Sequence, residues 1–546
     1  MKKVFNISVP TAKKSSKSGL FGAFTRYFWY TRWRYNAEKG VVSMSYEAIF
    51  FEKSDLQKFE MFRTLTVHHS DGLSISDLAT KLHLSYQQSY NIFQELLRDL
   101  VDLTDDTRAV CKKALNGTTP LKISLDDYRT YLLQDAIAFQ FIDYLVQGNR
   151  PSLDRFCAER YISRSTLMRK TIPVRNFLAD FHLKLSLTKT AFVGDEKQVR
   201  LFLQQFYWLS YHGTEWPFQA ISYRQLRAQY RELPSADPDP IVAAQERVFW
   251  AICRTRLLHG HYIKLDTTFA RTFRHYPFPT INFYQEKAFP GLTKHILTEE
   301  NAFFYFFQQK TIRFTPPSAD MKPAVAFIKH ADTPIWPLVR DLMTMLQQNL
   351  RDPADPVLQN DETLQMNLLR MTAAFALMGG NYVKQPDLFP PDAITYQQTQ
   401  LQTELAKFIA DLPDEPAYQP YHESAEAFMR VLFYLLVPYL RRFKWDNTIK
   451  VKLVMETTDI VYRNIINFLQ NLNVVELLPD NAPLSKADLL VTSLDDFIDR
   501  DQLTSDAGKM AIFNWYLDAT TSDYRALFEQ IAALYRAKLT RQATPA

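Results

Sequence analysis

Two short stretches of the chain carry side chains that could bind a polyanion, and they lie 78 residues apart. The second stretch combines cationic and hydroxyl groups, namely Arg164, Ser165, Thr166, Arg169 and Lys170. The first stretch offers polar groups with little charge, namely Tyr86, Gln87, Gln88 and Asn91. Groups of these kinds form hydrogen bonds with DNA phosphates and with base edges. Binding of double-stranded DNA is therefore the chemistry to which both sets are suited.

An internal repeat places these side chains on equivalent helices. Residues 73–91 match residues 151–169, and their apolar positions coincide: Ile75 with Leu153, Leu78 with Phe156, and Leu84 with Ile162. Ser85 aligns with Ser163, and each can cap the following helix by accepting a backbone N–H bond. A short helix, a turn and a capped second helix predict a helix-turn-helix in each copy, with the second helix entering the major groove.

The surroundings of the second copy are basic. Residues 150–185 contain eight Lys and Arg residues against three acidic ones. Residues 182–187 and 191–193 alternate like two strands joined by a turn, which would form a wing. Residues 1–40 contain nine Lys and Arg residues against one Glu, so a basic arm could strengthen DNA binding by the first copy.

Each of these features also has a purely structural explanation. A helix-turn-helix can be two packed helices without a ligand, and a basic terminal run can be a solvated tail. Two serine-capped copies, one of them with a basic exposed face, favour DNA binding over packing alone.

The rest of the chain is divided by prolines. Periodicity predicts helices over 55–70, 75–82, 86–100 and 125–147, with a polar stretch at 102–120. Aromatic-rich helical segments follow, separated by proline-rich breaks at 233–240, 352–356 and 386–420. Strands are expected at 449–454, 474–478 and 487–492, and helices at 459–470, 507–517 and 523–539.

This pattern predicts a mainly α, multidomain protein that ends in a small α/β domain with a mainly parallel sheet. The expected parts are a basic arm and a first winged helix-turn-helix domain at 1–148, a second winged helix-turn-helix domain at 149–200, helical domains at 201–322 and 323–445, and the α/β domain at 446–546.

The sequence resembles the Mga/AtxA-type virulence regulators of Gram-positive bacteria. The resemblance is most specific over residues 161–170, 181–186, 193–200 and 215–218, and it extends more weakly over the remaining chain. It implies a transcription regulator, with activation as its expected effect. It also implies two N-terminal DNA-binding domains, two central PTS-regulatory domains and a C-terminal domain similar to an EIIB phosphotransferase component.

The resemblance further implies histidine phosphorylation by phosphocarrier proteins of the sugar phosphotransferase system. The candidate phosphoacceptors are His212, His275 and His330. An exposed neutral imidazole is nucleophilic, although a histidine is more often a structural residue. His259 and His261 flank a glycine, but no nearby Cys or carboxylate completes a metal site, so no metal is expected.

The C-terminal domain departs from active EIIB components, which carry a nucleophilic cysteine after the first strand. The corresponding loop at 455–459 contains no cysteine, since the three cysteines are Cys111, Cys157 and Cys253. A structural or dimerising role is therefore expected for this domain, and a homodimer is the expected oligomer.

Several other classes of protein are disfavoured. The chain has no GxxxxGK[ST], HExxH or GxSxG motif, so neither an enzyme nor a bound cofactor is expected. The separated cysteines, the charged N-terminus and the lack of a long apolar run favour a cytoplasmic protein outside the membrane. The main alternative is an RNA-binding antiterminator linked to the phosphotransferase system, which would bind a hairpin RNA instead of duplex DNA.

Overall fold

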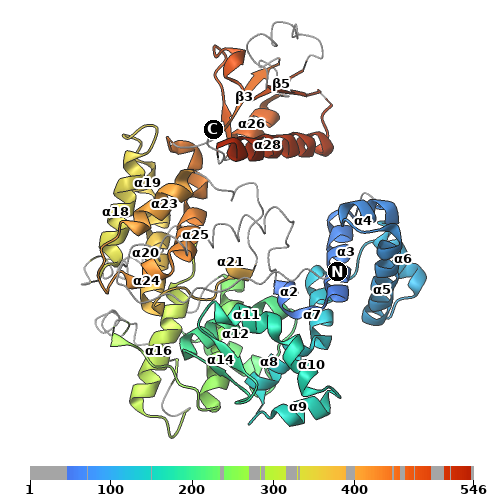
Figure 1. Ribbon diagram of the computed structural model, residues 1–546, viewed down its shortest axis with the longest axis vertical. Coiled ribbons are helices and arrows are strands. Elements are labelled where there is room, and N and C mark those ends of the chain that lie inside the picture. The colour runs from blue at the N-terminus through green and yellow to red at the C-terminus, as the bar shows by residue number, and fades with distance from the viewer. Residues whose placement is uncertain are drawn as a thin grey trace, which may run out of the picture. The chain divides into compact units, whose positions relative to one another are not determined.

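The structure is a computed structural model of the 546-residue chain (Figure 1). It describes residues 46–69, 72–148, 150–233, 239–267, 269, 283–284, 289–314, 329, 333–388, 400–444, 448–455, 462–472, 474–493, 510–516 and 518–542. The basic arm, His275 and His330 lie outside these residues. The described part is mainly helical and contains two small sheets, as the sequence predicts.

The described residues that precede Gly148 are entirely helices and their connections. The helices are α2 (Tyr46–Phe50), α3 (Lys53–Val67), α4 (Ile75–Lys81), α5 (Tyr86–Thr104), α6 (Arg108–Leu115), α7 (Leu125–Asp135) and α8 (Ile137–Gln147). The single helix expected over 125–147 is wrong, because Ala136 is extended (φ −73°, ψ 112°) and separates α7 from α8. The stretch at 102–120 contains α6, which its polar composition did not indicate.

No strand occurs among the described residues from 46 to 148, so the wing expected in the first unit is not found there. The second unit has one. Its elements are α9 (Leu153–Glu159), α10 (Arg164–Lys170), α11 (Ile172–Ala179), β1 (Lys184–Ser186) and β2 (Ala191–Val193). The two strands pair antiparallel, with Leu185 opposite Phe192, which confirms the predicted wing.

Helices dominate the middle of the chain. They are α12 (Glu196–Tyr211), α13 (Tyr223–Arg231), α14 (Pro240–Leu258), α16 (Lys294–Gln309), α18 (Ile335–Gln348), α19 (Val357–Asn360), α20 (Glu362–Met378), α21 (Gln385–Leu388), α23 (Gln400–Ala410), α24 (Gln419–Glu423), α25 (Ala425–Leu436) and the 3-10 helix η4 (Val437–Arg442).

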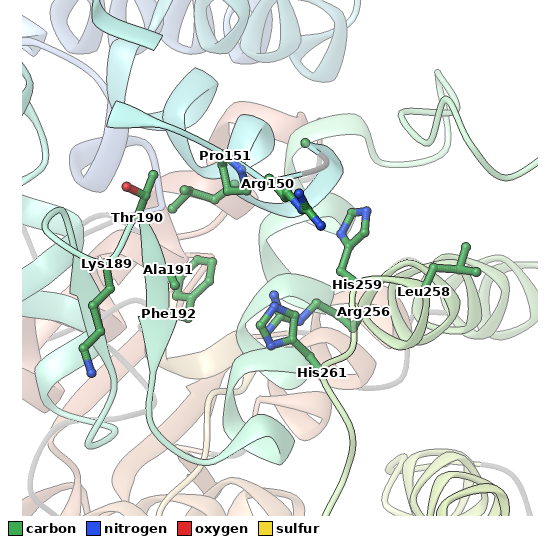
Figure 2. Close-up of a pocket in the computed structure, with 12 residues that line it drawn as sticks. Arg150, Pro151, Lys189, Thr190, Ala191, Phe192, Arg256, Leu258, His259 and His261 are labelled. Atoms are coloured by element: carbon green, nitrogen blue, oxygen red, sulfur yellow. The ribbon is translucent and has the colours of Figure 1, made fainter. Parts of the chain in front are cut away.

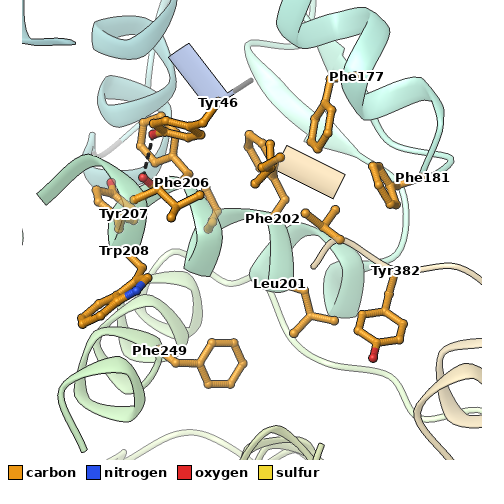
Figure 3. Packing of buried hydrophobic residues seen from close by; sticks show 14 of the residues in the cluster. Tyr46, Phe177, Phe181, Leu201, Phe202, Phe206, Tyr207, Trp208, Phe249 and Tyr382 are labelled. Carbon is orange, nitrogen blue, oxygen red and sulfur yellow. Dashed lines mark hydrogen bonds between the residues drawn. The ribbon is translucent and has the colours of Figure 1, made fainter. Parts of the chain in front are cut away.

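Helix α12 is almost completely buried, and Figure 3 shows several of its apolar side chains in the hydrophobic cluster. Phe202 packs against Phe177 of α11, and Phe206 contacts the ring of Phe50 in α2. The Tyr46 hydroxyl donates to the Phe206 carbonyl at 2.9 Å. Helix α12 therefore joins the second helix-turn-helix unit to the first helices and to the middle of the chain.

The C-terminal region has a separate core. Its elements are β3 (Ile449–Val454), α26 (Arg463–Asn471), β4 (Val475–Leu477), the 3-10 turn η6 (Leu484–Lys486), β5 (Leu489–Thr492), β6 (Ala511–Asn514) and α28 (Thr521–Gln542). The four strands are all parallel, in the order β4-β3-β5-β6. The helix expected at 507–517 is wrong, because residues 511–514 pair with β5 as an edge strand.

Two hydrophobic clusters account for the packing of the described residues. The larger one contains residues from Tyr46 to Phe443, and the smaller one contains residues from Ile449 to Tyr535. Among the described helices, none is both long and apolar enough to cross a membrane.

Candidate nucleic-acid interface

The sequence repeat is a repeat of backbone conformation. Helix α9 begins and ends at the residues that align with the ends of α4. In the connecting turns, His83 and Tyr161 occupy the same position and are both left-handed, with φ values of 53° and 52°. The next amides donate equivalent bonds, from Leu84 to the Ala79 carbonyl at 2.9 Å and from Ile162 to the Cys157 carbonyl at 3.0 Å. The chain thus contains two matching helix-turn-helix units.

The predicted serine caps are present in both units. Ser85 accepts a bond from the Gln88 amide at 3.2 Å, and its own amide donates to Gln88 Oε1 at 3.1 Å. Ser163 accepts a bond from the Thr166 amide at 3.1 Å. Each cap satisfies a backbone donor that the first helical turn leaves without a partner. Local hydrogen bonding therefore fixes where each second helix begins.

In the second unit, four of the five predicted residues have intramolecular partners. Ser165 and Thr166 share hydrogen bonds with the Ser163 hydroxyl, at 2.8 and 2.9 Å. Arg164 is 65% exposed and donates to Asp154 at 2.7 Å, which holds the guanidinium near the start of α10. These contacts position the side chains close to the helix N-terminus, where they remain at the surface.

The two remaining cations of α10 differ from each other. Arg169 is exposed and forms no ion pair with a described acidic residue. Lys170 is only 26% exposed in its side chain and forms an ion pair with Glu52. Arg169 is therefore the more available of the two for a phosphate or a base, and Lys170 ties α10 to the segment before α3.

In the first unit, the predicted side chains are exposed, but some of them form hydrogen bonds within α5 or with its cap. Tyr86 is 58% exposed at the start of α5. Gln87 donates to Asn91 at 3.0 Å, one helical turn further on. The side-chain oxygen of Gln88 belongs to the capping box with Ser85. The structural role of Gln88 is thus to cap the start of α5.

Four exposed residues of the second unit were not among the DNA-contacting residues predicted from the sequence. Lys184 and Lys189 are exposed on the wing, one on β1 and the other in its turn. Tyr161 in the turn is 96% exposed, and Met168 on α10 is 52% exposed. The alternation of Lys184 with the buried Leu183 and Leu185 was a usable signal for its outward position. Tyr161 and Met168 carried none, because apolar side chains are expected in the core.

His212 is the one predicted phosphoacceptor among the described residues. It ends α12 in a left-handed conformation with φ 40°, and its ring is 47% exposed. Nδ1 lies 2.6 Å from Oδ2 of Asp126 in α7. Burial raises the pKa of Asp126, but the hydrogen bond with His212 and the charge of Arg129 outweigh it and hold that pKa below its usual value.

The Asp126 carboxylate also belongs to an ionic chain. Arg129 pairs with Asp126 and donates from Nε to Glu47 of α2 at 2.7 Å. These ionic contacts therefore link the end of α12 to α7 and α2. Among the described residues, no cluster of three His, Cys, Asp or Glu side chains could hold a metal ion.

These geometries define a helix-turn-helix protein with two such units, the second of which has a wing. Residues 121–207 match the family of the Mga helix-turn-helix domain. This span contains α9, α10, both wing strands and most of α12. The resemblance to Mga/AtxA-type regulators is thereby confirmed.

Two curated relatives share this similarity. A putative trans-acting regulator of Streptococcus pneumoniae serotype 4 is 26% identical over 133 residues, which are 23% of this chain and 27% of that protein. The capsule synthesis positive regulator AcpB of Bacillus anthracis is 21% identical over 232 residues, which are 41% of this chain and 47% of that protein. The aligned regions thus cover less than half the length of either relative.

Proposed function

We propose that the protein is a transcription regulator that binds double-stranded DNA through its two helix-turn-helix units. The observation that carries this proposal is the matched pair of capped helices, of which the second exposes Arg169 and belongs to a unit with a lysine-bearing wing. Phosphate contacts supply most of the affinity of such a surface, and residues at the helix start supply base contacts. The similarity to proteins named as regulators supports the same class.

Two other functions have less support. An RNA-binding antiterminator would need a different N-terminal module, and the described residues from 46 to 148 are helical. An enzyme would need a reactive constellation, and the sequence has no recognisable catalytic motif. DNA binding therefore has the most support of the three functions.

The proposal extends to regulation at His212. Asp126 hydrogen-bonds Nδ1, which directs the other ring nitrogen, Nε2, away from the carboxylate. A phosphocarrier protein of the sugar phosphotransferase system would transfer its phosphoryl group to Nε2, with the carrier histidine as the leaving group. The added phosphate brings about −1.5 to −2 charges next to Asp126, so it would weaken that contact.

The domain assignments are part of the same proposal. We assign two PTS-regulatory domains to 201–322 and 323–445 and an EIIB-like domain to 446–546. The separate hydrophobic cluster after Ile449 and the four-stranded parallel sheet support the last boundary. We also propose that the EIIB-like domain contributes to a homodimer, since the sequence contains no cysteine after Cys253 that could carry a phosphoryl group.

A gel-shift titration tests the DNA assignment. The full-length chain is titrated against random duplex DNA and a hairpin RNA at two salt concentrations, together with an Arg164→Ala/Arg169→Ala/Lys170→Ala variant. We expect tight, salt-sensitive duplex binding that the triple variant loses. A Lys407→Ala variant, at an exposed position of α23, shows the effect of removing one positive charge outside the two units. Failure of a folded wild-type protein to bind duplex DNA at low salt would refute the proposal.

Phosphorylation is tested separately. The chain is incubated with the phosphotransferase enzymes and phosphoenolpyruvate, and phosphohistidine is located by mass spectrometry under neutral conditions. His212→Ala should lose the modification at residue 212, whereas His295→Ala, an exposed histidine on α16, should keep it. Asp126→Asn should slow the modification of His212. Absence of phosphate at residue 212 in the wild-type protein would exclude this site.

A further inference from the structure

A cavity of about 410 Å³ lies beside the wing of the second helix-turn-helix unit. One wall is the wing itself, with Lys189 to Phe192. The others are formed by Leu145 of α8 with Gly148 at its end, by Arg150 and Pro151 before α9, and by Arg256, Leu258, His259 and His261 at and just after the end of α14 (Figure 2). The volume lies within the range of roughly 300–1,000 Å³ that is typical of small-molecule sites.

The titratable residues that line this cavity are all basic. They are Arg150, Lys189, Arg256, His259 and His261, and none of the twelve lining residues is acidic. Figure 2 shows the Arg150 and His259 side chains pointing toward each other, with the His261 ring near Arg256. Glu196 of α12 balances the charge of Arg256, so the remaining formal positive charges of the lining are those of Arg150 and Lys189.

Hydrogen bonds hold Arg256 and the turn that follows α14 in place. The Arg256 side chain is 4% exposed and donates twice to Glu196, at 2.8 and 2.7 Å. The amides of His259 and His261 both donate to the Arg256 carbonyl, at 3.2 and 3.0 Å. Gly260 adopts φ 78° between them, a conformation that a side chain would strain. The two imidazoles are therefore presented by a fixed turn.

His261 can offer a hydrogen-bond donor to this cavity without carrying a charge. Burial, together with the charge of Arg256, keeps the pKa of His261 below its usual value, although Glu196 opposes this shift. The nearby His259 and Arg200 act in the same direction as Arg256. At neutral pH the His261 ring is thus uncharged and can donate one N–H bond without the cost of burying a second full charge.

We propose that this cavity binds a small phosphorylated metabolite, with the phosphate between Arg150 and the two histidines. A phosphate offers three terminal oxygens, one for each of these three lining side chains, whereas a carboxylate offers two. The metal alternative lacks ligands, because no described carboxylate or cysteine completes a site with His259 and His261. On the proposed DNA-binding function, the ligand would act beside the wing and lower DNA affinity by cancelling positive charge.

Isothermal titration calorimetry of the full-length chain without DNA tests the site. The probes are pyrophosphate and glucose 6-phosphate, with glucose as the neutral match and gluconate as the carboxylate match. We expect the phosphates to bind, and the Arg150→Gln and His259→Asn variants to weaken them by roughly tenfold or more. Arg155→Gln removes an equal charge from an exposed, neighbouring residue and should bind like the wild type.

The other outcomes count against the proposal. Equal binding by Arg155→Gln and Arg150→Gln, or by glucose and glucose 6-phosphate, would overturn it, and so would stronger binding of gluconate. No heat from any probe would do the same. Because DNA is absent from this experiment, its result is independent of the DNA assignment. A later gel shift, in which glucose 6-phosphate weakens DNA binding by the wild type and not by His259→Asn, tests the coupling.

Discussion

The two helix-turn-helix units have the same backbone and different surfaces. Their turns agree within one degree in φ at His83 and Tyr161, and a serine caps the second helix of each. The first unit exposes amides and a tyrosine, and it has no strand in its described residues. The second exposes cations and carries a wing.

This difference separates what makes the motif from what makes its ligand contacts. The caps, the left-handed turn residue and the apolar spacing determine the geometry of the two helices. The exposed positions are free of that constraint, and there Asn91 is replaced by Arg169 at the equivalent site. We therefore expect the second unit to supply most of the electrostatic affinity and the first to contribute less.

The largest expected effect is at the matched pair Arg169 and Asn91. Arg169→Ala should weaken duplex binding by about tenfold or more and reduce the salt dependence by about one ion, since it removes one phosphate or base contact. Asn91→Ala should weaken binding by roughly threefold or less and leave the salt dependence unchanged. Gel shifts at several salt concentrations measure both quantities. Equal effects of the two substitutions would mean that both units contribute equally to the affinity for DNA.

A gain of function is the second prediction. Asn91→Arg places in the first unit the charge that the second unit already has, so it should tighten duplex binding by roughly threefold to fivefold at low salt. The gain should shrink as salt is raised, because its origin is counterion release. Asn91→Gln is the neutral control. A tighter complex with no change in salt dependence would contradict the electrostatic explanation.

The third prediction concerns Gln88, which the structure places in a capping box. Gln88→Ala should lower the stability of α5 by about 0.5–1 kcal/mol, whereas Gln88→Glu should preserve it, because a carboxylate can accept the same bond near the positive helix end. Amide hydrogen exchange of α5 measures this. If Gln88 also faces DNA, Gln88→Glu will weaken duplex binding while stability is unchanged.

Much of this architecture was predictable because it is local. The two serine caps, the starts of α5 and α10 and the strand pair of the second unit each depend on a few neighbouring residues, and these were found as expected. The division of α7 from α8 was missed because Ala136 has no helix-breaking character of its own. Strand β6 was missed because a short apolar run does not distinguish a strand from a helix, and β5 supplies its pairing partner.

The contacts that modify the candidate site were not predictable, because they join distant residues. Lys170 meets Glu52, and His212 meets Asp126 across 86 residues of sequence. A single sequence gives no means to pair such positions. The exposed cations could be selected by type, but their availability depends on which of them has an acidic neighbour in the fold.

The smallest expected effect tests whether the two turns are equivalent. Left-handed backbone costs a residue with a side chain about 1 kcal/mol, and glycine avoids this cost but loses more entropy on folding. His83→Gly and Tyr161→Gly should therefore change local stability by less than about 1 kcal/mol and by equal amounts. Hydrogen exchange of the Leu84 and Ile162 amides, which donate the equivalent turn bonds, measures the change at each site. A clear loss at Tyr161 alone would show that this exposed side chain makes a contact that His83 does not, and the two turns would then differ in energy despite their shared conformation.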